Sequence, residues 1–90
     1  MTAGQSMTLA QLIERWLDDI APQRTPRTIH EYRRVAGHDV LPALGTKRID
    51  RLTARDIDNH YRLLLERGLS GASVRRNHAL LHASLGRAVK

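Results

Sequence analysis

Apolar residues recur at spacings of three and four in four stretches of the chain, a pattern typical of amphipathic α-helices. The first stretch begins at Thr8, where Thr8 and Gln11 fit a capping box, and it ends near Pro22. Residues 1–7 show no periodicity, so we expect them to form a disordered N-terminal tail. The apolar face of the first predicted helix consists of Leu9, Leu12, Ile13, Trp16, Leu17 and Ile20.

The second stretch starts at Thr25 and Pro26. Thr is a favourable N-cap, and Pro fits the first helical position because its missing N–H is not needed there. Pro42 and Gly45 then close the segment that follows this helix. The residues expected to face the core from the helix and this segment are Ile29, Tyr32, Val35, Ala36, Val40, Leu41 and Leu44.

The third stretch starts at Thr53, which forms a second capping box with Asp56, and Gly68 stands where a left-handed residue ends the helix. Its predicted buried face consists of Ile57, Tyr61, Leu64 and Leu65. Ser70 is the expected cap of the last stretch, which reaches Lys90 without a stop signal. Its apolar positions are Val74, Leu81, Leu85 and Val89. We therefore expect an all-α, compact four-helix bundle over residues 8–90, cut from a longer protein.

Length and composition narrow the class of protein. Ninety residues form one domain, and 41% hydrophobic residues suffice for a core, which must be largely aliphatic because Phe is absent. The absence of Cys excludes disulfides and zinc–thiolate sites. The chain has no signal peptide pattern and no apolar run of transmembrane length. We expect a cytoplasmic protein without a membrane partner.

The charge indicates a polyanionic partner. The chain carries 15 Lys and Arg against 9 Asp and Glu, and 13 of these cations are Arg, which matches phosphate geometry. Residues 23–90 hold 14 of the 15 cations and only six of the anions. Such a balance favours nucleic acid, although a basic solvated surface is an alternative in Arg-rich proteomes.

Several short motifs occur along the chain in a specific order, and this order is more informative than any motif alone. They are Thr8-Leu9, Thr25-Pro26-Arg27-Thr28 with Tyr32, Leu41-Pro42-Ala43-Leu44-Gly45, Ile49, Leu52 and Thr53 ahead of Asp56-Ile57, Glu66-Arg67-Gly68-Leu69-Ser70, and Ala72-Ser73-Val74-Arg75-Arg76 to Leu81. Together they resemble the N-terminal core-binding domain of tyrosine recombinases of the phage-integrase type. The resemblance covers residues 8–90.

This resemblance implies a SAM-like four-helix bundle with orthogonal helix packing that clamps one face of a double-stranded recombination site. A separate C-terminal catalytic domain of the same parent chain would clamp the other face, and further recombinase protomers would bind the same DNA. The source would be bacterial or phage-derived, with the protein at the nucleoid when bound. Two residues depart from the family pattern: Gly71 replaces a frequent Pro, and Asn77 stands at a frequently apolar position. These departures predict a looser start of the last helix.

The sequence contains no catalytic set. The family resemblance implies a Tyr nucleophile with Arg, Lys and a His-x-x-Arg pair, and residues 30–33 match this pair only as His-Glu-Tyr-Arg within the predicted second helix. With five His and 13 Arg in the chain, such a pair easily arises by chance. His78 and His82 lie four apart but lack a third metal ligand. We expect no enzyme activity, metal, cofactor or small-molecule substrate in this chain.

Two predicted helix starts carry Arg together with hydroxyl side chains. Helix N-termini attract phosphate, Arg pairs with phosphate or guanine, and Asn matches adenine. We expect Arg27, Arg75 and Arg76 to be the foremost contacts. The full set of candidate DNA-binding residues is Arg24, Thr25, Arg27, Thr28, His30, Arg34, Ser70, Ser73, Arg75, Arg76 and Asn77.

Each candidate also has a simpler interpretation as an exposed side chain in a weak ion pair, for example Arg27 with Glu31. A second basic run, Arg48, Arg51 and Arg55, is compatible with a flanking backbone contact or with a solvated face. The residues expected to serve only packing are Trp16, Leu17, Ile57, Tyr61, Leu81 and Leu85.

Two other classes of protein fit the same composition. A helical protein–protein interaction module would use the basic face for an acidic partner. A stand-alone helix-turn-helix-like regulator would need a short turn between two helices and a dimer helix, and the chain has neither pattern.

Overall fold

The structure, a computed structural model, describes the backbone of residues 7–89 and the side chains of residues 7–86. All regular secondary structure in this part of the chain is helical. One isolated β-bridge pairs Thr8 with Arg48. The elements are α1 (Leu9–Ile20), the 3-10 turn η2 (Ala21–Gln23), α2 (Pro26–Val35), the π-helix η3 (Ala36–Val40), α3 (Leu41–Leu44), the 3-10 turn η4 (Ile49–Arg51), α4 (Ala54–Glu66) and α5 (Gly71–Val89).

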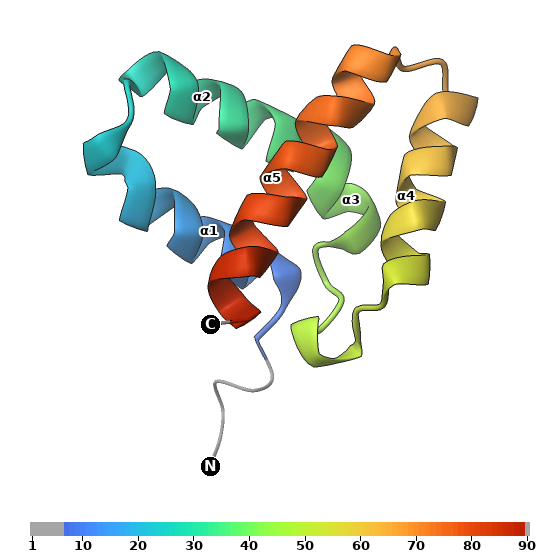
Figure 1. The fold of residues 1–90 in the computed structure, drawn as a ribbon, viewed down its shortest axis with the longest axis horizontal. Helices are drawn as coiled ribbons and strands as arrows, with labels where there is room; N and C mark the ends of the chain where they lie inside the picture. The colour runs from blue at the N-terminus through green and yellow to red at the C-terminus, as the bar shows by residue number, and fades with distance from the viewer. Residues whose placement is uncertain (1–6, 90) are drawn as a thin grey trace.

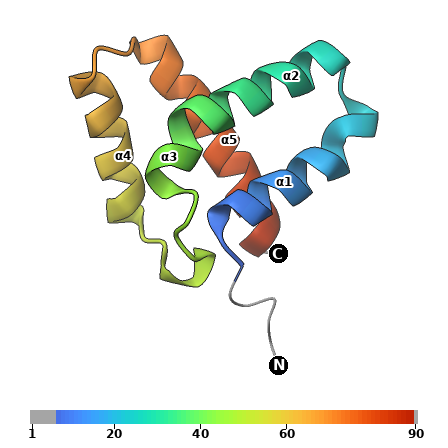
Figure 2. The same ribbon diagram turned by 180° about the vertical axis from the view of Figure 1, so that it is seen from behind.

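The predicted four-helix, all-α bundle is confirmed, since α2, η3 and α3 follow one another as a single bent helical run (Figure 1). The helix α5 passes through the middle of the molecule, with α1 and α2 on one side and α4 on the other (Figures 1 and 2). It crosses the C-terminal half of α2 instead of running beside it (Figure 1). No helix in the described part of the chain is long and apolar enough to cross a membrane.

The predicted helix starts are confirmed, and each has a hydroxyl that accepts a hydrogen bond from the backbone N–H three residues later. The capping residues are Thr8, Thr25, Thr53 and Ser70. At Thr8 and Thr53 the box is complete, because the side chains of Gln11 and Asp56 accept from the capping N–H at 3.0 Å. Gly68 ends α4 with φ of 92°, a left-handed conformation that suits glycine.

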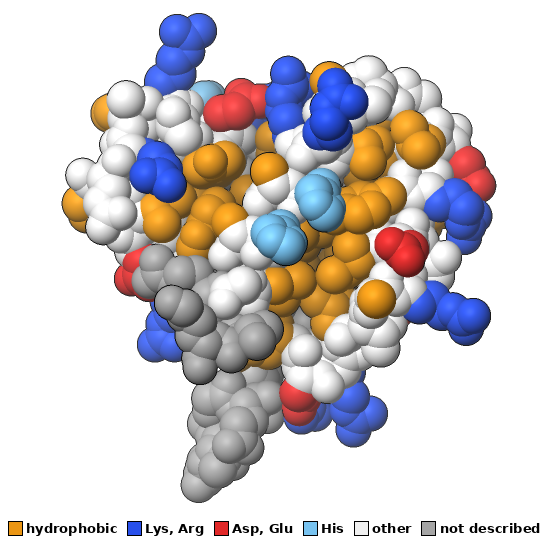
Figure 3. Space-filling model, viewed as in Figure 1, with side chains coloured by type: hydrophobic (Ala, Val, Ile, Leu, Met, Phe, Trp, Pro, Cys, Tyr) orange, Lys and Arg blue, Asp and Glu red, His pale blue; other side chains and the backbone are white. Residues whose placement is uncertain are grey.

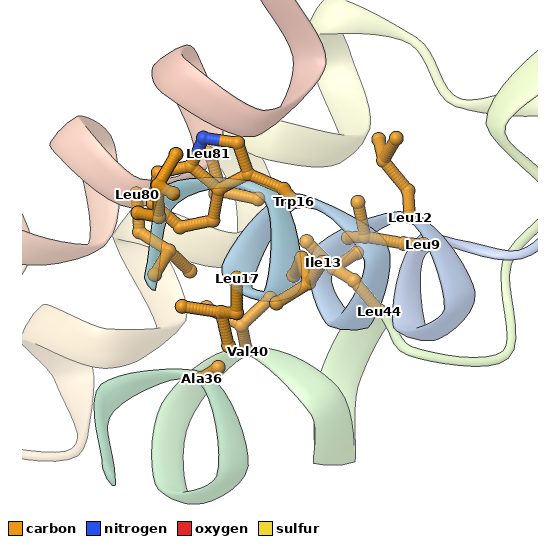
Figure 4. Packing of buried hydrophobic residues seen from close by; sticks show 11 residues of the cluster. Leu9, Leu12, Ile13, Trp16, Leu17, Ala36, Val40, Leu44, Leu80 and Leu81 are labelled. Carbon is orange, nitrogen blue, oxygen red and sulfur yellow. The ribbon is translucent and has the colours of Figure 1, made fainter. Parts of the chain in front are cut away.

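The core lies between α1, the α2–η3–α3 run and α5 (Figure 4). All six apolar residues predicted for the face of α1 are buried, as expected. Trp16 packs on Tyr32 of α2 with a ring-centroid distance of 5.2 Å. From α5 the core receives Leu81, which was predicted, and Leu80, which is fully buried and was not among the predicted positions.

The bend between α2 and α3 follows from local backbone chemistry. In the π-helix the N–H of Leu41 donates to the carbonyl of Ala36, five residues earlier. Pro42, the next residue, has no N–H to continue the ladder. The run ends at Gly45, where a Cβ would lie 2.6 Å from the carbonyl oxygen of Leu41, so only glycine fits this turn.

The loop after α3 covers the start of α1. The N–H groups of Leu9 and Ala10 donate to the carbonyls of Lys47 and Gly45 at 2.9 and 3.0 Å. These bonds use donors that a helix N-terminus otherwise leaves free. The Met7 carbonyl accepts from the N–H of Ile49 at 3.0 Å, so Met7 also takes part in this contact. The remaining tail residues, 1–6, lie outside the described residues.

The prediction for α4 was wrong at one position. Leu65 was expected in the core but is 54% exposed, whereas His60 is 2% exposed. The helix packs mainly against α5, so its buried face centres on His60 and Leu64, and Ile57 and Tyr61 are partly buried. A helix held from one side has room for fewer buried positions than its apolar residues suggest.

Candidate nucleic-acid interface

The outward face of α2 carries three of the predicted contacts. Arg27, His30 and Arg34 are exposed, and they lie opposite the inner residues Ile29 and Tyr32. At the start of the helix the Thr25 hydroxyl accepts from the Thr28 N–H at 3.2 Å. Arg24 precedes the helix and is exposed. The N-terminus of α2 therefore presents basic side chains and helix N–H groups to solvent together.

The first turns of α5 carry a similar set. Ser70 caps the helix, with its hydroxyl oxygen 3.2 Å from the Ser73 nitrogen. Arg75 and Arg76 are exposed, and Ser73 is partly buried. A Cβ at Gly71 would lie 3.7 Å from Nη1 of Arg75, which shows that this guanidinium reaches back over the first turn. Its charge therefore lies near the positive end of the helix dipole, where an anion is favoured.

The tertiary structure brings these two helices together along one edge. A cleft of about 190 Å³ separates the C-terminal half of α2 from the start of α5, with Arg34 on one side and Arg76 on the other. In Figure 3, Lys and Arg side chains gather along this upper edge of the molecule, above α2 and the N-terminal part of α5. We call the edge formed by Arg27, His30, Arg34, Arg75 and Arg76 the basic edge.

One carboxylate interrupts the basic edge. Glu31 accepts two hydrogen bonds from Arg34, one of them from Nε at 3.2 Å. The expected pair of Arg27 with Glu31 is therefore wrong, because Glu31 pairs with Arg34 instead. The hydrogen bond from Arg34 lowers the pKa of Glu31, and the charge of Arg76 across the cleft acts in the same direction. The same hydrogen bond raises the pKa of Arg34. Both side chains therefore stay charged at neutral pH.

The arginines of α2 divide into two groups. Arg33 points to α1, where it pairs with Glu14 at 3.2 Å and with Asp18 at 3.6 Å. Within residues 7–86, Arg27 and Arg75 form no ion pair, so their charges are not offset by a bonded carboxylate. The charges of Arg27 and Arg75 on the basic edge are therefore available to a polyanion, whereas the charge of Arg33 is offset by the carboxylates of α1.

The placement predicted for Asn77 was wrong. Its side chain is fully buried, and every polar atom on it has a partner inside the protein. Nδ2 donates to Oδ2 of Asp39 at 3.0 Å and to the carbonyl of Ser73 at 2.9 Å, and Oδ1 lies 3.1 Å from Nε2 of His60. In this arrangement Asn77 cannot reach an adenine. At the start of α5 the first turn is bonded by the Ser70 cap and by Nδ2 of Asn77, and the looser start stays a prediction.

Sequence reasoning missed the buried carboxylate that Asn77 contacts. Asp39 in η3 is 8% exposed, and its other oxygen lies 3.1 Å from Nδ1 of His38. Burial raises the pKa of Asp39, but the hydrogen bonds from Asn77 and His38 outweigh it and leave the pKa below its ordinary value. One sequence signal was available for Asn77 itself, since it lies three and four residues before the buried Leu80 and Leu81.

The helix α5 also forms an apolar groove with α4. The groove has a volume of about 370 Å³, and three residues predicted to be core, Ile57, Tyr61 and Leu85, line it while only partly buried. His78 and His82 stack across its middle with ring centroids 5.6 Å apart, and His side chains stand out there in Figure 3. The complete lining is Ala54, Ile57, Asp58, Tyr61, His78, Leu81, His82, Leu85 and Gly86.

The histidines of this groove have hydrogen-bond and ring contacts but no metal-binding set. Nδ1 of His78 lies 3.1 Å from the Tyr61 hydroxyl. Burial, together with the negative charge of Asp58, raises the pKa of Tyr61. Among the described residues, no group of three or more His, Cys, Asp or Glu side chains is placed to hold a metal ion.

The second basic run, Arg48, Arg51 and Arg55, surrounds η4 and reaches the start of α4, away from the basic edge. Arg48 pairs with Asp50 at 2.9 Å, and the neighbouring Lys47 pairs with Asp56 at 3.3 Å. Arg51 and Arg55 are exposed. The pKa of Asp56 is lowered, chiefly by the hydrogen bond that its carboxylate accepts from the Thr53 N–H in the capping box. The ion pairs of Arg48 and Lys47 thus stabilise the turn η4 and the start of α4. A contact of Arg48, Arg51 and Arg55 with a DNA backbone stays a prediction.

Comparison with known proteins identifies the class of this domain. Residues 8–65 match the family described as phage integrase, N-terminal SAM-like domain, which is more than half of the chain. The chain therefore belongs to this family, and the resemblance found in the sequence is confirmed. It is also similar to a protein named integrase from Saccharopolyspora erythraea, with 27% identity over 90 residues. That alignment covers 97% of this chain and 21% of the relative, so the chain spans about a fifth of it. No solved structure matches the chain.

Proposed function

We propose that this domain binds double-stranded DNA and forms the core-binding half of a clamp in a site-specific tyrosine recombinase. The observation that carries the proposal is the basic edge, where α2 and the first turns of α5 present Arg27, Arg75 and Arg76 to solvent. Membership of the integrase family supports a DNA substrate. The basic edge supplies what a DNA backbone requires, which is positive charge from two helices on one edge.

The physical basis is the pairing of helix ends and guanidinium groups with phosphate. The N-termini of α2 and α5 are capped by single hydroxyls, which leaves other N–H groups of their first turns for an anion. The start of α1 differs, because the loop carbonyls of Gly45 and Lys47 already occupy its N–H groups. We therefore assign the phosphate contacts to α2 and α5, with Arg34 and Arg76 on either side of the cleft between them.

In this proposal the domain holds DNA and performs no chemistry on it. Cleavage and rejoining belong to a catalytic domain elsewhere in the parent chain, and further protomers bind the same recombination site. The relative named integrase is about five times longer than the aligned region, which leaves room for such a domain in that protein. A clamp loses effective concentration when its halves are separated, so the isolated domain binds DNA more weakly than its parent.

The test is a titration of labelled duplex DNA at two salt concentrations, followed by backbone amide shifts. We expect shifts at residues 24–34 and 70–76, and an affinity that falls with a log–log slope of about −0.9 per phosphate contacted. Arg75→Ala with Arg76→Ala should weaken binding, whereas Arg62→Ala should not, because Arg62 pairs with Glu66 on α4. DNA that leaves the amides of α2 and α5 unmoved at low salt would overturn the proposal.

A second candidate function rests on a different observation, the apolar groove between α4 and α5. Ile57, Tyr61 and Leu85 remain partly exposed there, and apolar grooves of this kind accept the apolar face of a partner helix. A helical protein-interaction module would use this groove and leave the basic edge free. If the titration moves no amide of α2 or α5, this candidate takes first place.

A further inference from the structure

A buried hydrogen bond joins the two helical segments that carry the basic edge. It runs from Nδ2 of Asn77 in α5 to Oδ2 of Asp39 in η3, over 3.0 Å. Asn77 directly follows Arg76 in the chain, and Asp39 lies on the same helical run as Arg34. Asp39 also lines the cleft whose two sides are formed by Arg34 and Arg76. The bond therefore lies beneath the place where the two arginines face each other.

We propose that Asn77 is a positioning residue for DNA binding: its hydrogen bond to Asp39 fixes α5 against η3 and so sets the spacing of Arg34 and Arg76. This inference rests on the proposed function. It assigns to Asn77 a role that acts through its neighbours and not through contact with DNA. The third partner, His60, anchors the same amide to α4 and keeps it from rotating.

The chemistry of the site supports positioning over simple packing. An apolar contact tolerates sliding of one helix along another, whereas a buried hydrogen bond loses its full value when donor and acceptor separate. Asn77, Asp39 and His60 are 0, 8 and 2% exposed, so water does not replace a lost partner cheaply. Among the described side chains no buried polar atom lacks a hydrogen-bond partner, so a shift of one helix would break a bond that nothing else replaces.

The charge of Asp39 adds a smaller contribution than the hydrogen bond, in the same direction. Its carboxylate acts on Arg34, raising the pKa of that guanidinium after the larger effect of Glu31. A fixed anion at the bottom of the cleft also draws cationic side chains toward it and limits how far they spread. Substitution of Asp39 by Asn and by Ala separates this charge effect from the hydrogen bond, because both remove the charge and only Asn keeps an acceptor for Asn77.

The experiment compares Asp39→Asn, Asp39→Ala and Asn77→Ala with the unchanged chain in the duplex titration at low salt. Circular dichroism first establishes that each variant is folded at the titration temperature. We expect Asp39→Asn to bind within about two-fold of the unchanged chain. Both alanine variants should bind roughly ten-fold more weakly, as when two charge-assisted contacts no longer form together. Residual dipolar couplings should report a changed angle between α2 and α5 in the alanine variants only.

Ser84→Ala is the matched control, because Ser84 is also fully buried in α5 but bonds only to carbonyls of its own helix. A merely structural role for Asn77 predicts that all folded variants bind DNA alike, and this result would overturn the inference. The two alanine variants remove the same hydrogen bond, one by deleting its donor and the other by deleting its acceptor. Either variant that folds therefore suffices to test the role of Asn77. If neither folds, Asp39→Ser takes their place, because its hydroxyl is one bond shorter than the carboxylate and no longer reaches Nδ2 of Asn77. Binding of this variant equal to that of Asp39→Asn overturns the inference.

The outcome also separates this inference from the proposed function. If the unchanged chain shows no DNA-dependent shifts, the DNA-binding function fails and positioning fails with it. If the unchanged chain binds and the alanine variants bind equally well with an unchanged angle between α2 and α5, DNA binding stands and the role of Asn77 is overturned.

Discussion

The helices α1 and α5 bury positions with the same spacing but with different chemistry. In α1 the buried positions 9, 12, 13 and 16 are all apolar, whereas the corresponding positions 77, 80, 81 and 84 of α5 include an amide and a hydroxyl. The sequence pattern identified the whole buried face of α1. It identified only Leu81 among these four positions in α5. Asn77 and Ser84 are polar and look like breaks in the apolar stripe, and Leu80 between them was missed as well.

The two buried polar residues of α5, Asn77 and Ser84, satisfy their hydrogen-bonding groups in different ways. The Ser84 hydroxyl bonds to carbonyls of its own helix, those of Leu80 at 2.9 Å and Leu81 at 3.3 Å. Asn77 has more donors and acceptors than its own turn can satisfy, so it also bonds to η3 and α4. A buried polar residue that makes all its hydrogen bonds within its own helix constrains that helix alone. A buried polar residue that needs partners on other segments also constrains how those segments are arranged.

The largest effect is expected where the two helices are alike. Ile13→Ala in α1 and Leu81→Ala in α5 each remove a side chain that is 1% exposed at corresponding positions of the stripe. Each should lower the free energy of unfolding by about 2 to 5 kcal/mol, through lost transfer energy and the cavity left behind. Urea denaturation followed by circular dichroism measures both. A loss under about 1 kcal/mol at either site would mean that the two stripes are not equivalent.

The next effect separates the two polar positions. Asn77→Ala removes the hydrogen-bond partner of Oδ2 of the buried Asp39 and of Nε2 of the buried His60, and should cost about 1 to 3 kcal/mol of the free energy of unfolding. Ser84→Ala leaves carbonyls that remain bonded within the helix and should cost less than about 1 kcal/mol. Thermal and urea unfolding of both variants test this order. Equal losses would show that Asn77 contributes no more than a local hydrogen bond.

The third prediction concerns the exposed side of α5, where charge should affect binding and not folding. Arg76→Ala should weaken DNA binding uniformly across duplex sequences and reduce the salt slope by about 1, the value for one phosphate contact. The free energy of unfolding should change by less than about 0.5 kcal/mol, because the side chain is exposed. Fluorescence anisotropy at several salt concentrations gives the slope. An unchanged slope would remove Arg76 from the phosphate contacts.

The smallest effect is a dependence of stability on pH. The hydrogen bonds from Asn77 and His38 hold the pKa of Asp39 below its ordinary value of 3.8 despite the opposing effect of burial. A carboxylate with a lowered folded-state pKa stabilises the protein above its unfolded-state pKa, and this stability is lost as pH falls through the folded-state pKa. The stability difference between the unchanged chain and Asp39→Asn should therefore shrink below the ordinary pKa of 3.8.

Urea titrations of both proteins from neutral pH downward measure this difference. Ser84→Ala serves as the control, since it adds and removes no titrating group. A difference between the unchanged chain and Asp39→Asn that stays constant through the acid range would show that the Asp39 carboxylate is not stabilised by its partners.

The sequence predicted most of the fold because the signals involved are local. The hydroxyl caps at Thr8, Thr25, Thr53 and Ser70 act within one turn. Gly68 is favoured by the left-handed backbone conformation at its own position. The apolar stripe of α1 likewise needs only helical geometry to fall on one face. Exposure of Arg27, Arg75 and Arg76 follows from their places opposite or beside such stripes.

The candidate interface was only partly predictable from the sequence. The two basic helix starts were found, because each is a local cluster of Arg and hydroxyl residues. Their meeting at one edge, with Arg34 and Arg76 across a cleft, required the crossing of α2 by α5. The burial of Asn77 and His60 was missed, since their partners are 38 and 17 residues away in the chain.

Local chemistry, then, determined where the helices of this protein begin and end, which face of α1 is buried and which helix ends carry charge. The tertiary structure alone decided that Asn77 joins three elements, that Leu65 of α4 is exposed and that α4 and α5 leave an apolar groove. The reason is physical. Backbone hydrogen bonds and caps are satisfied within a few residues, whereas burial and side-chain partners depend on which segments pack together after the chain has folded.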